Sequence, residues 1–138
     1  MGSSLGKRVL IVDDDEHIRV IVSKLVEHAG YRTLTAPGGA EALAHLVTGE
    51  PVDLIILDID MPGMNGFEVL KRARDKGVTA PVVMLTARTK DEHVLEGYQL
   101  GADYYVTKPF QAQTVLNIVQ FLIGDLTAEQ RTELEKKL

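Results

Sequence analysis

Five short, mostly apolar runs alternate along the chain with longer amphipathic stretches, and this alternation limits the fold more than any other feature. The apolar runs are continuous rather than alternating, which is typical of parallel strands covered on both faces. We predict strands at residues 9–12, 31–36, 54–57 and 82–85, and a fifth that begins with 104–106 and ends near 108–109. After each strand, apolar residues recur at helical spacing. The pattern therefore predicts a strand followed by a helix, five times over.

Glycines mark the ends of the predicted helices. The first helical pattern begins at Ile18 and stops at Gly30, a common helix-ending residue. The other helices are predicted at residues 40–47, 67–76, 91–100 and 111–123. Parallel strands joined by helices need right-handed crossovers, so helices cover both faces of the sheet. We predict an α/β fold, a doubly wound five-stranded parallel sheet in the common order 2-1-3-4-5.

The length and composition fit one domain. The chain has 138 residues, and a domain usually has about 100–200. Cysteine is absent, which excludes disulfides, thiolate metal sites and a cysteine nucleophile. The net charge of −5 disfavours binding along a nucleic-acid backbone, and no apolar run approaches the roughly 20 residues of a membrane span. We expect a cytoplasmic protein that contacts neither nucleic acid directly nor a membrane.

Two terminal segments lie outside the repeating pattern. Residues 1–6 are a short segment of small residues, either a leader or an expression remnant, and residues 7–124 form the predicted domain. In residues 125–138, Thr127 and Gln130 have capping-box spacing, which predicts a short helix from Ala128 to the end. This charged segment is either a solvated extension, or a linker or contact arm for a partner.

Polar side chains follow four of the predicted strands. Ligands of an open parallel sheet bind beyond the carboxyl ends of its strands, where the sequence has Asp13, Asp14, Asp15, Asp58, Thr86 and Lys108. In the predicted strand order Asp13, Asp14 and Asp58 lie close together, and such carboxylates resist ionisation unless a cation is present. Oxygen ligands without cysteine or clustered histidine favour Mg²⁺ or Mn²⁺. The alternative is that Asp14 or Asp15 merely caps a helix.

Four motifs at these strand ends resemble those of the receiver domain of two-component response regulators. They are VLIVDDD at residues 9–15, LDIDMPGMNG at 57–66, TA at 86–87 and KPF at 108–110. Each motif is weak alone, but all four in this order and at these spacings are highly specific. The resemblance implies a CheY-like fold and a phosphoacceptor, rather than a conventional enzyme. It also suggests a cis peptide bond between Lys108 and Pro109.

The resemblance implies a role for each residue around the pocket. Asp58 is the implied phosphoacceptor, and Mg²⁺ is held by Asp14, Asp58 and the backbone carbonyl of Asp60, with Asp13 acting through water. Thr86 and Lys108 contact the phosphoryl oxygens. The implied switch residues are Thr86 and Tyr105, although Tyr105 also suits an ordinary half-buried strand position. Residues that border the pocket and tune the phosphoryl lifetime are Glu16, Asp60 and Arg88.

The resemblance also implies partners. The phosphoryl group comes from a sensor histidine kinase or a phosphotransfer protein, and the output is a downstream protein or domain. Residues 109–124 contain no charged residue, so the fifth helix has more apolar surface than one core-facing stripe requires. We expect either a homodimer or output interface there, or an ordinary broad core stripe.

Other functions fit the sequence less well. Asp58 and Asp60 resemble the aspartate pair of haloacid-dehalogenase-like phosphatases, but those enzymes carry it on their first strand. A calcium loop starting at Asp58 would have Val69 where glutamate is required. A dinucleotide site would need a glycine-rich turn after the first strand, where acids stand instead. A phosphorylation-independent interaction module of the same fold stays open as a second hypothesis.

Overall fold

The computed structural model describes residues 6–87 and 99–138, and within them five strands form one parallel sheet. The strands are β1 (Arg8–Val12), β2 (Arg32–Ala36), β3 (Leu54–Asp58), β4 (Val82–Thr86) and β5 (Tyr104–Thr107). Their order across the sheet is β2-β1-β3-β4-β5, and each neighbouring pair is parallel. The predicted α/β class and strand order are confirmed.

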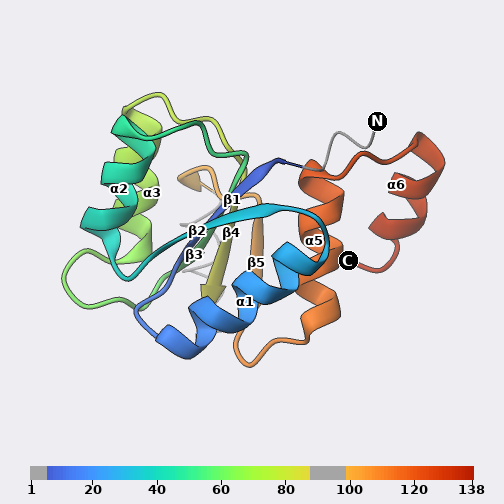
Figure 1. Ribbon diagram of the computed structural model, residues 1–138, viewed down its shortest axis with the longest axis horizontal. Helices are drawn as coiled ribbons and strands as arrows, with labels where there is room; N and C mark the ends of the chain where they lie inside the picture. Colours follow the sequence, from blue (N-terminus) through green and yellow to red (C-terminus); the bar gives the residue numbers. More distant parts are fainter. Residues whose placement is uncertain (1–5, 88–98) are drawn as a thin grey trace.

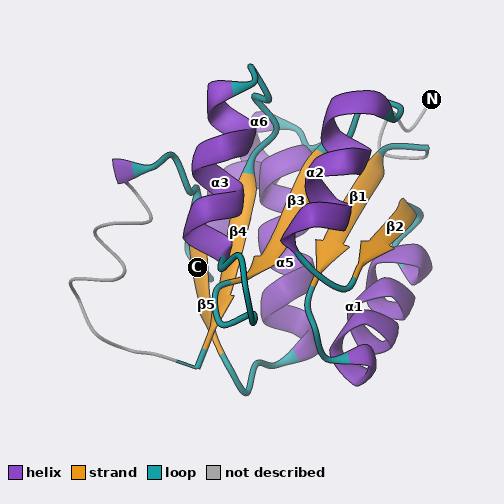
Figure 2. Cartoon of the chain, turned by 90° about the vertical axis from the view of Figure 1, so that its left-hand side faces the viewer, coloured by secondary structure: helices purple, strands orange, loops and turns teal. Residues whose placement is uncertain are grey.

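Helices cover both faces of this sheet (Figures 1 and 2). One face carries α1 (Glu16–His28) and α5 (Ala112–Ile123), and the other carries α2 (Gly39–Thr48) and α3 (Gly66–Asp75). A short helix α6 (Ala128–Glu135) lies beside α5, on the far side of the molecule from α2 and α3 (Figure 1). None of the described helices has the length and apolar character needed to cross a bilayer. The predicted helix at 91–100 lies almost entirely outside the described residues.

The continuous apolar runs follow from this two-sided covering. In β1, Val9 and Ile11 belong to the core under α1 and α5, whereas Leu10 and Val12 belong to the core under α2 and α3. Successive side chains of a strand point to opposite faces, so a strand buried on both faces needs apolar residues at every position. All four of these side chains are fully buried.

The observed elements differ from the predicted ones mainly at their ends. β3 and β4 each extend one residue further than predicted and so include Asp58 and Thr86. Helix α1 begins at Glu16 because the Asp15 side chain caps it. Helix α6 begins at Ala128, as predicted, with both hydrogen bonds of the capping box present.

Candidate functional site

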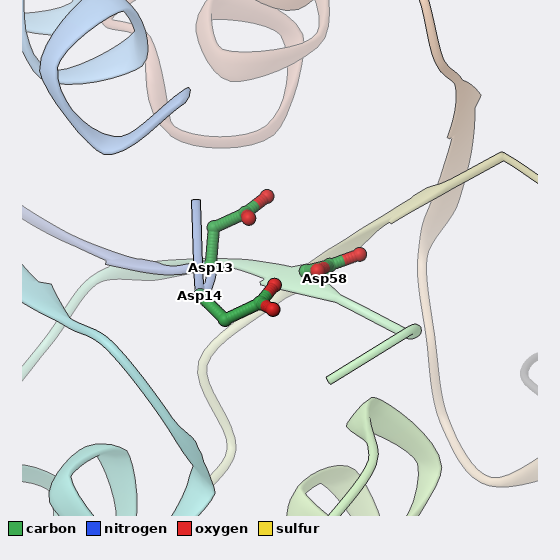
Figure 3. A group of neighbouring side chains, drawn as sticks. All are labelled: Asp13, Asp14 and Asp58. Carbon is green, nitrogen blue, oxygen red and sulfur yellow. The ribbon is translucent and has the colours of Figure 1, made fainter. Parts of the chain in front are cut away.

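Three carboxylates meet at the carboxyl ends of β1 and β3. Val12 of β1 pairs with Leu57 of β3, so Asp13 and Asp14 emerge from the sheet next to Asp58. One carboxylate oxygen from each aspartate lies within 4.8 Å of the others, and Figure 3 shows the three side chains gathered at this edge. Asp13 and Asp58 are buried and Asp14 is exposed. The predicted proximity of the carboxylates is confirmed.

Lys108 brings a positive charge to the two buried carboxylates. Its Nζ lies 2.9 Å from Oδ2 of Asp13 and 3.3 Å from Oδ1 of Asp58. The backbone N–H of Lys108 donates to the carbonyl of Thr86 at 2.7 Å, which fixes the segment after β5 to the end of β4. The peptide bond between Lys108 and Pro109 is cis, as expected.

Burial and charge alter the ionisation of this pair. Burial, together with the negative charge of Asp13, raises the pKa of Asp58 from 3.8 to about 6, and the attraction of Lys108 limits the rise. Burial alone would lower the pKa of Lys108. However, its hydrogen bond to Asp13 and the charges of Asp58 and Asp13 outweigh burial, so the pKa of Lys108 lies above its ordinary 10.5. The site therefore favours an added cation once Asp58 is ionised.

Short local hydrogen bonds shape the loop after β1. Oδ1 of Asp13 accepts from the backbone N–H of Asp15 at 2.9 Å, and Oδ1 of Asp15 accepts from the N–H of His17 at 2.8 Å. Asp15 is thus the helix cap, and Asp14 is left at the carboxylate cluster. The guanidinium of Arg19 donates to the carbonyl of Asp13 at 2.7 Å. Nothing in the sequence distinguished Arg19 from an ordinary surface arginine of α1.

The loop after β3 is held close to Asp58 by Gly66. A Cβ on Gly66 would lie 2.5 Å from the carbonyl oxygen of Asp58 and 2.8 Å from the Cα of Ile59. The N–H of Gly66 donates to the carbonyl of Ile59 at 3.0 Å, and the N–H of Asp60 donates to Oδ1 of Asp58 at 3.2 Å. In the sequence, Gly66 is only the last residue of the motif at 57–66, and its packing against Asp58 was not predicted.

The remaining predicted site residues lie at different depths. Thr86 is buried at the end of β4, the strand next to β3. Tyr105 is half-buried and packs against the core on the α2 and α3 face. Glu16 and Asp60 are exposed beside the carboxylate cluster. Arg88 lies outside the described residues.

The donor set fits a hard divalent cation. Carboxylate oxygens are the only ligand type in the cluster of Asp13, Asp14 and Asp58. Mg²⁺ prefers such oxygen ligands and usually retains several waters, which suits an exposed Asp14 beside two buried partners. The same arrangement would not suit zinc, which favours nitrogen and sulfur ligands in tetrahedral sites.

Comparison with known proteins gives one consistent result. Residues 9–120 match the family model described as response regulator receiver domain. The chain is 40% identical over 111 residues to the alkaline phosphatase synthesis transcriptional regulatory protein PhoP of Bacillus subtilis, covering 80% of this chain and 46% of PhoP. It is 39% identical over 114 residues to the phosphate regulon transcriptional regulatory protein PhoB of Pseudomonas aeruginosa, covering 81% of this chain and 49% of PhoB. The chain thus spans about half the length of these curated relatives.

Solved structures agree with the sequence match. The chemotaxis protein CheY4 of Vibrio cholerae superposes with a TM-score of 0.79 at 39% identity, covering 86% of this chain and 99% of CheY4. The response regulator protein TrrA of Thermotoga maritima, solved in complex with Mg²⁺-BeF, gives a TM-score of 0.76 at 38% identity. That match covers 85% of this chain and 99% of TrrA.

Proposed function

The chain belongs to the response regulator receiver domain family, and from this premise we propose that Asp58 is the carboxylate at which it accepts a phosphoryl group. Receiver domains are the phosphoacceptors of two-component signalling, not conventional enzymes, and a histidine kinase is the partner that this implies. The observation that carries the assignment is the buried Asp58 carboxylate, grouped with Asp13 and Asp14 and contacted by the Lys108 ammonium.

Phosphoryl transfer to a carboxylate depends on positioning and charge neutralisation. A carboxylate is a weak nucleophile, and the transferred group carries negative charge on its three oxygens. Asp58 is held by the backbone N–H of Asp60 on one oxygen, and Lys108 lies 3.3 Å from that same oxygen. We propose that Lys108 moves its ammonium from the carboxylates to the incoming phosphoryl oxygens, and that the hydroxyl of Thr86 donates to another.

The proposed direct ligands of Mg²⁺ are the carboxylates of Asp14 and Asp58 and the backbone carbonyl of Asp60, and Asp13 would act through water. When bound, the ion supplies positive charge to the carboxylates and to the transferred group. Asp13 lies deeper than Asp14 and already accepts from Lys108 and from the N–H of Asp15. This supports an indirect role for Asp13, through water, and a direct one for exposed Asp14.

A phosphoryl group on Asp58 carries roughly −1.5 to −2 charges, which replace the single charge of the ionised carboxylate in a buried site. We propose that Thr86 moves toward this charge and that Tyr105 takes the space it leaves. Tyr105 lies opposite Met84 in the pairing of β4 and β5, and Thr86 lies opposite Thr107, so both residues belong to the same strand pair. The affected surface would consist of the predicted fourth helix, β5 and α5.

Three residues at the rim are proposed to tune the phosphoryl lifetime. Glu16 and Asp60 are exposed on the loops after β1 and β3, from which they border the route of attacking water. Arg88 completes the proposed set from the segment after β4.

Partners beyond the kinase remain proposals for this chain. The phosphodonor is a sensor histidine kinase or a phosphotransfer protein, and the recipient of the signal is an output protein or domain. The relatives named above are transcriptional regulators, and this chain covers only about half of each. We also propose a homodimer through α5. We propose the cytoplasm as the location, because the partner kinase needs ATP.

Uptake of a phosphoryl group tests the proposal. The protein is incubated with Mg²⁺ and either acetyl phosphate or phosphoramidate, and its intact mass is measured for the wild type and for Asp58→Ala. Only the wild type is expected to gain the mass of one phosphoryl group, and EDTA should abolish the gain. Absence of the gain in wild type would reject the phosphoacceptor and favour a phosphorylation-independent module.

A further inference from the structure

An arginine of α6 rests on an aromatic ring of α5. The guanidinium carbon of Arg131 lies 4.4 Å from the ring centroid of Phe121, and its Nη1 donates to the carbonyl oxygen of Phe121 at 2.6 Å. The other side of this cluster is Tyr104 of β5, whose ring meets that of Phe121 edge-on at 82° with 6.3 Å between centroids. Arg131 thus binds both the ring and the backbone of one residue, near the end of α5.

Helix α6 lies beyond the residues that match the family model. The family match ends at residue 120, whereas α6 covers Ala128–Glu135. The hydroxyl of Thr127 accepts from the N–H of Gln130 at 3.1 Å, and the Gln130 side chain accepts from the N–H of Thr127 at 2.9 Å. These reciprocal bonds satisfy the helix start locally, so α6 does not depend on α5 for its first turn.

The docking of α6 on α5 is loose. No residue of α6 is buried. Two hollows, of about 240 and 410 Å³, lie where α6 meets the end of α5. A helix held by few buried contacts opens more readily than the core does. The Arg131–Phe121 contact is therefore well placed to hold α6 against α5; we call this contact the clasp.

The surface under this clasp suits a second copy of the same chain. The whole chain carries a net charge of −5, so two copies repel each other unless they meet through a region without charge. Residues 109–124 form such a region, and its half-buried apolar side chains include Leu116, Phe121 and Leu122. Helix α6 is a neighbour of α5 in Figure 1, and its Arg131 lies over the ring of Phe121 within this region.

We propose that α6 is a displaceable cover for the Phe121 end of α5, closed by Arg131, and that a second copy of this chain competes for the covered surface. The second half of this statement rests on the proposed α5 homodimer. The first half depends neither on dimerisation nor on phosphorylation of Asp58.

The test compares Arg131→Ala with Lys136→Ala in the full chain. Both variants lose one positive charge from the same helical segment, but the Lys136 ammonium pairs with Glu133 rather than with α5. Hydrogen exchange of the α6 amides and hydroxyl-radical labelling of Phe121 report the cover. Sedimentation over a concentration series reports association, and exchange of the α5 core amides checks that the variant is folded.

Arg131→Ala is expected to speed α6 exchange about tenfold, as loss of one cation–π contact and one hydrogen bond implies. It should also increase labelling of Phe121 and tighten self-association several-fold, with Lys136→Ala like the wild type. Unchanged α6 exchange and Phe121 labelling in Arg131→Ala would overturn the cover. Increased labelling in a variant that sediments as a monomer would overturn the second copy as the competing occupant. The intact-mass measurement with acetyl phosphate would show separately whether Asp58 fails to take up a phosphoryl group, so the two proposals can fail independently.

Discussion

The site places Asp58 where its ionised form is costly. Asp58 is only 1% exposed, and its carboxylate lies next to that of the buried Asp13. Lys108 compensates in part, since its ammonium contacts both carboxylates, yet the pKa of Asp58 still rises to about 6. Near neutral pH and without metal, Asp58 is therefore ionised at a cost in free energy, and a bound cation would reduce that cost. This local cost is the physical reason to expect a divalent cation at the site.

Removing the Asp58 charge should stabilise the metal-free protein. Asp58 binds its proton more tightly in the folded state than in the unfolded state, so stability falls as pH rises from about 4 to about 6 and stays lower above that. A rise from 3.8 to about 6 corresponds to at most about 3 kcal/mol. Asp58→Asn should therefore raise the free energy of unfolding at pH 7.5 in EDTA, measured by urea denaturation.

The same variant should flatten the pH dependence. The wild type should gain stability between pH 7.5 and pH 5 from the protonation of Asp58, and Asp58→Asn should lack that gain. The matched control is Asp75→Asn at the exposed end of α3, which removes one carboxylate and leaves the cluster of Asp13, Asp14 and Asp58 intact. Equal stability changes in the two variants would show that burial of Asp58 is not the cause.

Lys108 should matter most when Asp58 and Asp13 are both ionised. Lys108→Gln leaves two buried carboxylates without their cation, so it should destabilise the metal-free protein by roughly 1–3 kcal/mol at pH 7.5. Lys24→Gln, on the exposed face of α1, is the control. The loss should shrink in an Asp58→Asn background, as a double-mutant cycle of urea denaturation would measure. A loss of the same size in both backgrounds would refute coupling between Lys108 and Asp58.

At the scale of elements, the start of α3 determines where the Asp58 backbone lies. The first residue of α3 is Gly66, and its Cα approaches the backbone of Asp58 and Ile59 so closely that no side chain fits. The side chain of Asn65 caps the helix by accepting from the N–H of Glu68 at 3.0 Å. Helix α3 therefore starts against the end of β3 and supports the loop that carries Asp60.

Adding one methyl group at Gly66 should disturb the site. Gly66→Ala places Cβ against backbone atoms that cannot rotate away, so we expect a loss of roughly 1–3 kcal/mol, typical of overpacking, and weaker Mg²⁺ binding. Gly38→Ala is the control, because its Cβ would meet only the far end of the Glu41 side chain at 3.0 Å. Urea denaturation and Mg²⁺ titration test both. Wild-type Mg²⁺ affinity in Gly66→Ala would contradict the supporting role of α3.

At the scale of the whole molecule, the strand order assembles the site. β1 and β3 are neighbours although 41 residues lie between the end of β1 at Val12 and the start of β3 at Leu54. The ends of β4 and β5 lie next along the same edge. Because residues from four strands contribute, binding at this edge requires the folded sheet. A ligand that binds only the folded state raises the stability of the entire domain.

Mg²⁺ should therefore stabilise the domain against heat. At a free Mg²⁺ concentration 100 times the Kd, the expected gain is about 2.7 kcal/mol, seen as a higher Tm than in EDTA. Asp14→Asn should keep most of the metal-free stability, because Asp14 is exposed, but should lose much of the Mg²⁺ effect. Thermal denaturation by circular dichroism measures both, with Asp75→Asn as control. A full Mg²⁺ shift in Asp14→Asn would exclude Asp14 as a ligand.

The sequence alone determined the elements and the chemistry of the strand ends. Continuous apolar runs and helical spacing are local properties, so they predicted the parallel sheet and the carboxylates beyond β1 and β3. The capping pattern predicted the start of α6 for the same reason. The strand order was predicted only as the common order of doubly wound sheets. The apolar pattern did not predict the last residues of β3 and β4, because Asp58 and Thr86 are polar and belong to the strands through their pairing with neighbouring strands.

Only the tertiary structure decided which distant groups touch. The packing of the elements sets four contacts between distant residues. Lys108 contacts both buried carboxylates, and Gly66 packs against the backbone of Asp58. Arg19 donates to the carbonyl of Asp13, and Arg131 contacts the ring of Phe121. Local patterns specify whether a chain segment forms a helix or a strand and which of its sides is apolar. They do not specify the distances between side chains of separate segments, because those distances follow from the packing of the whole core.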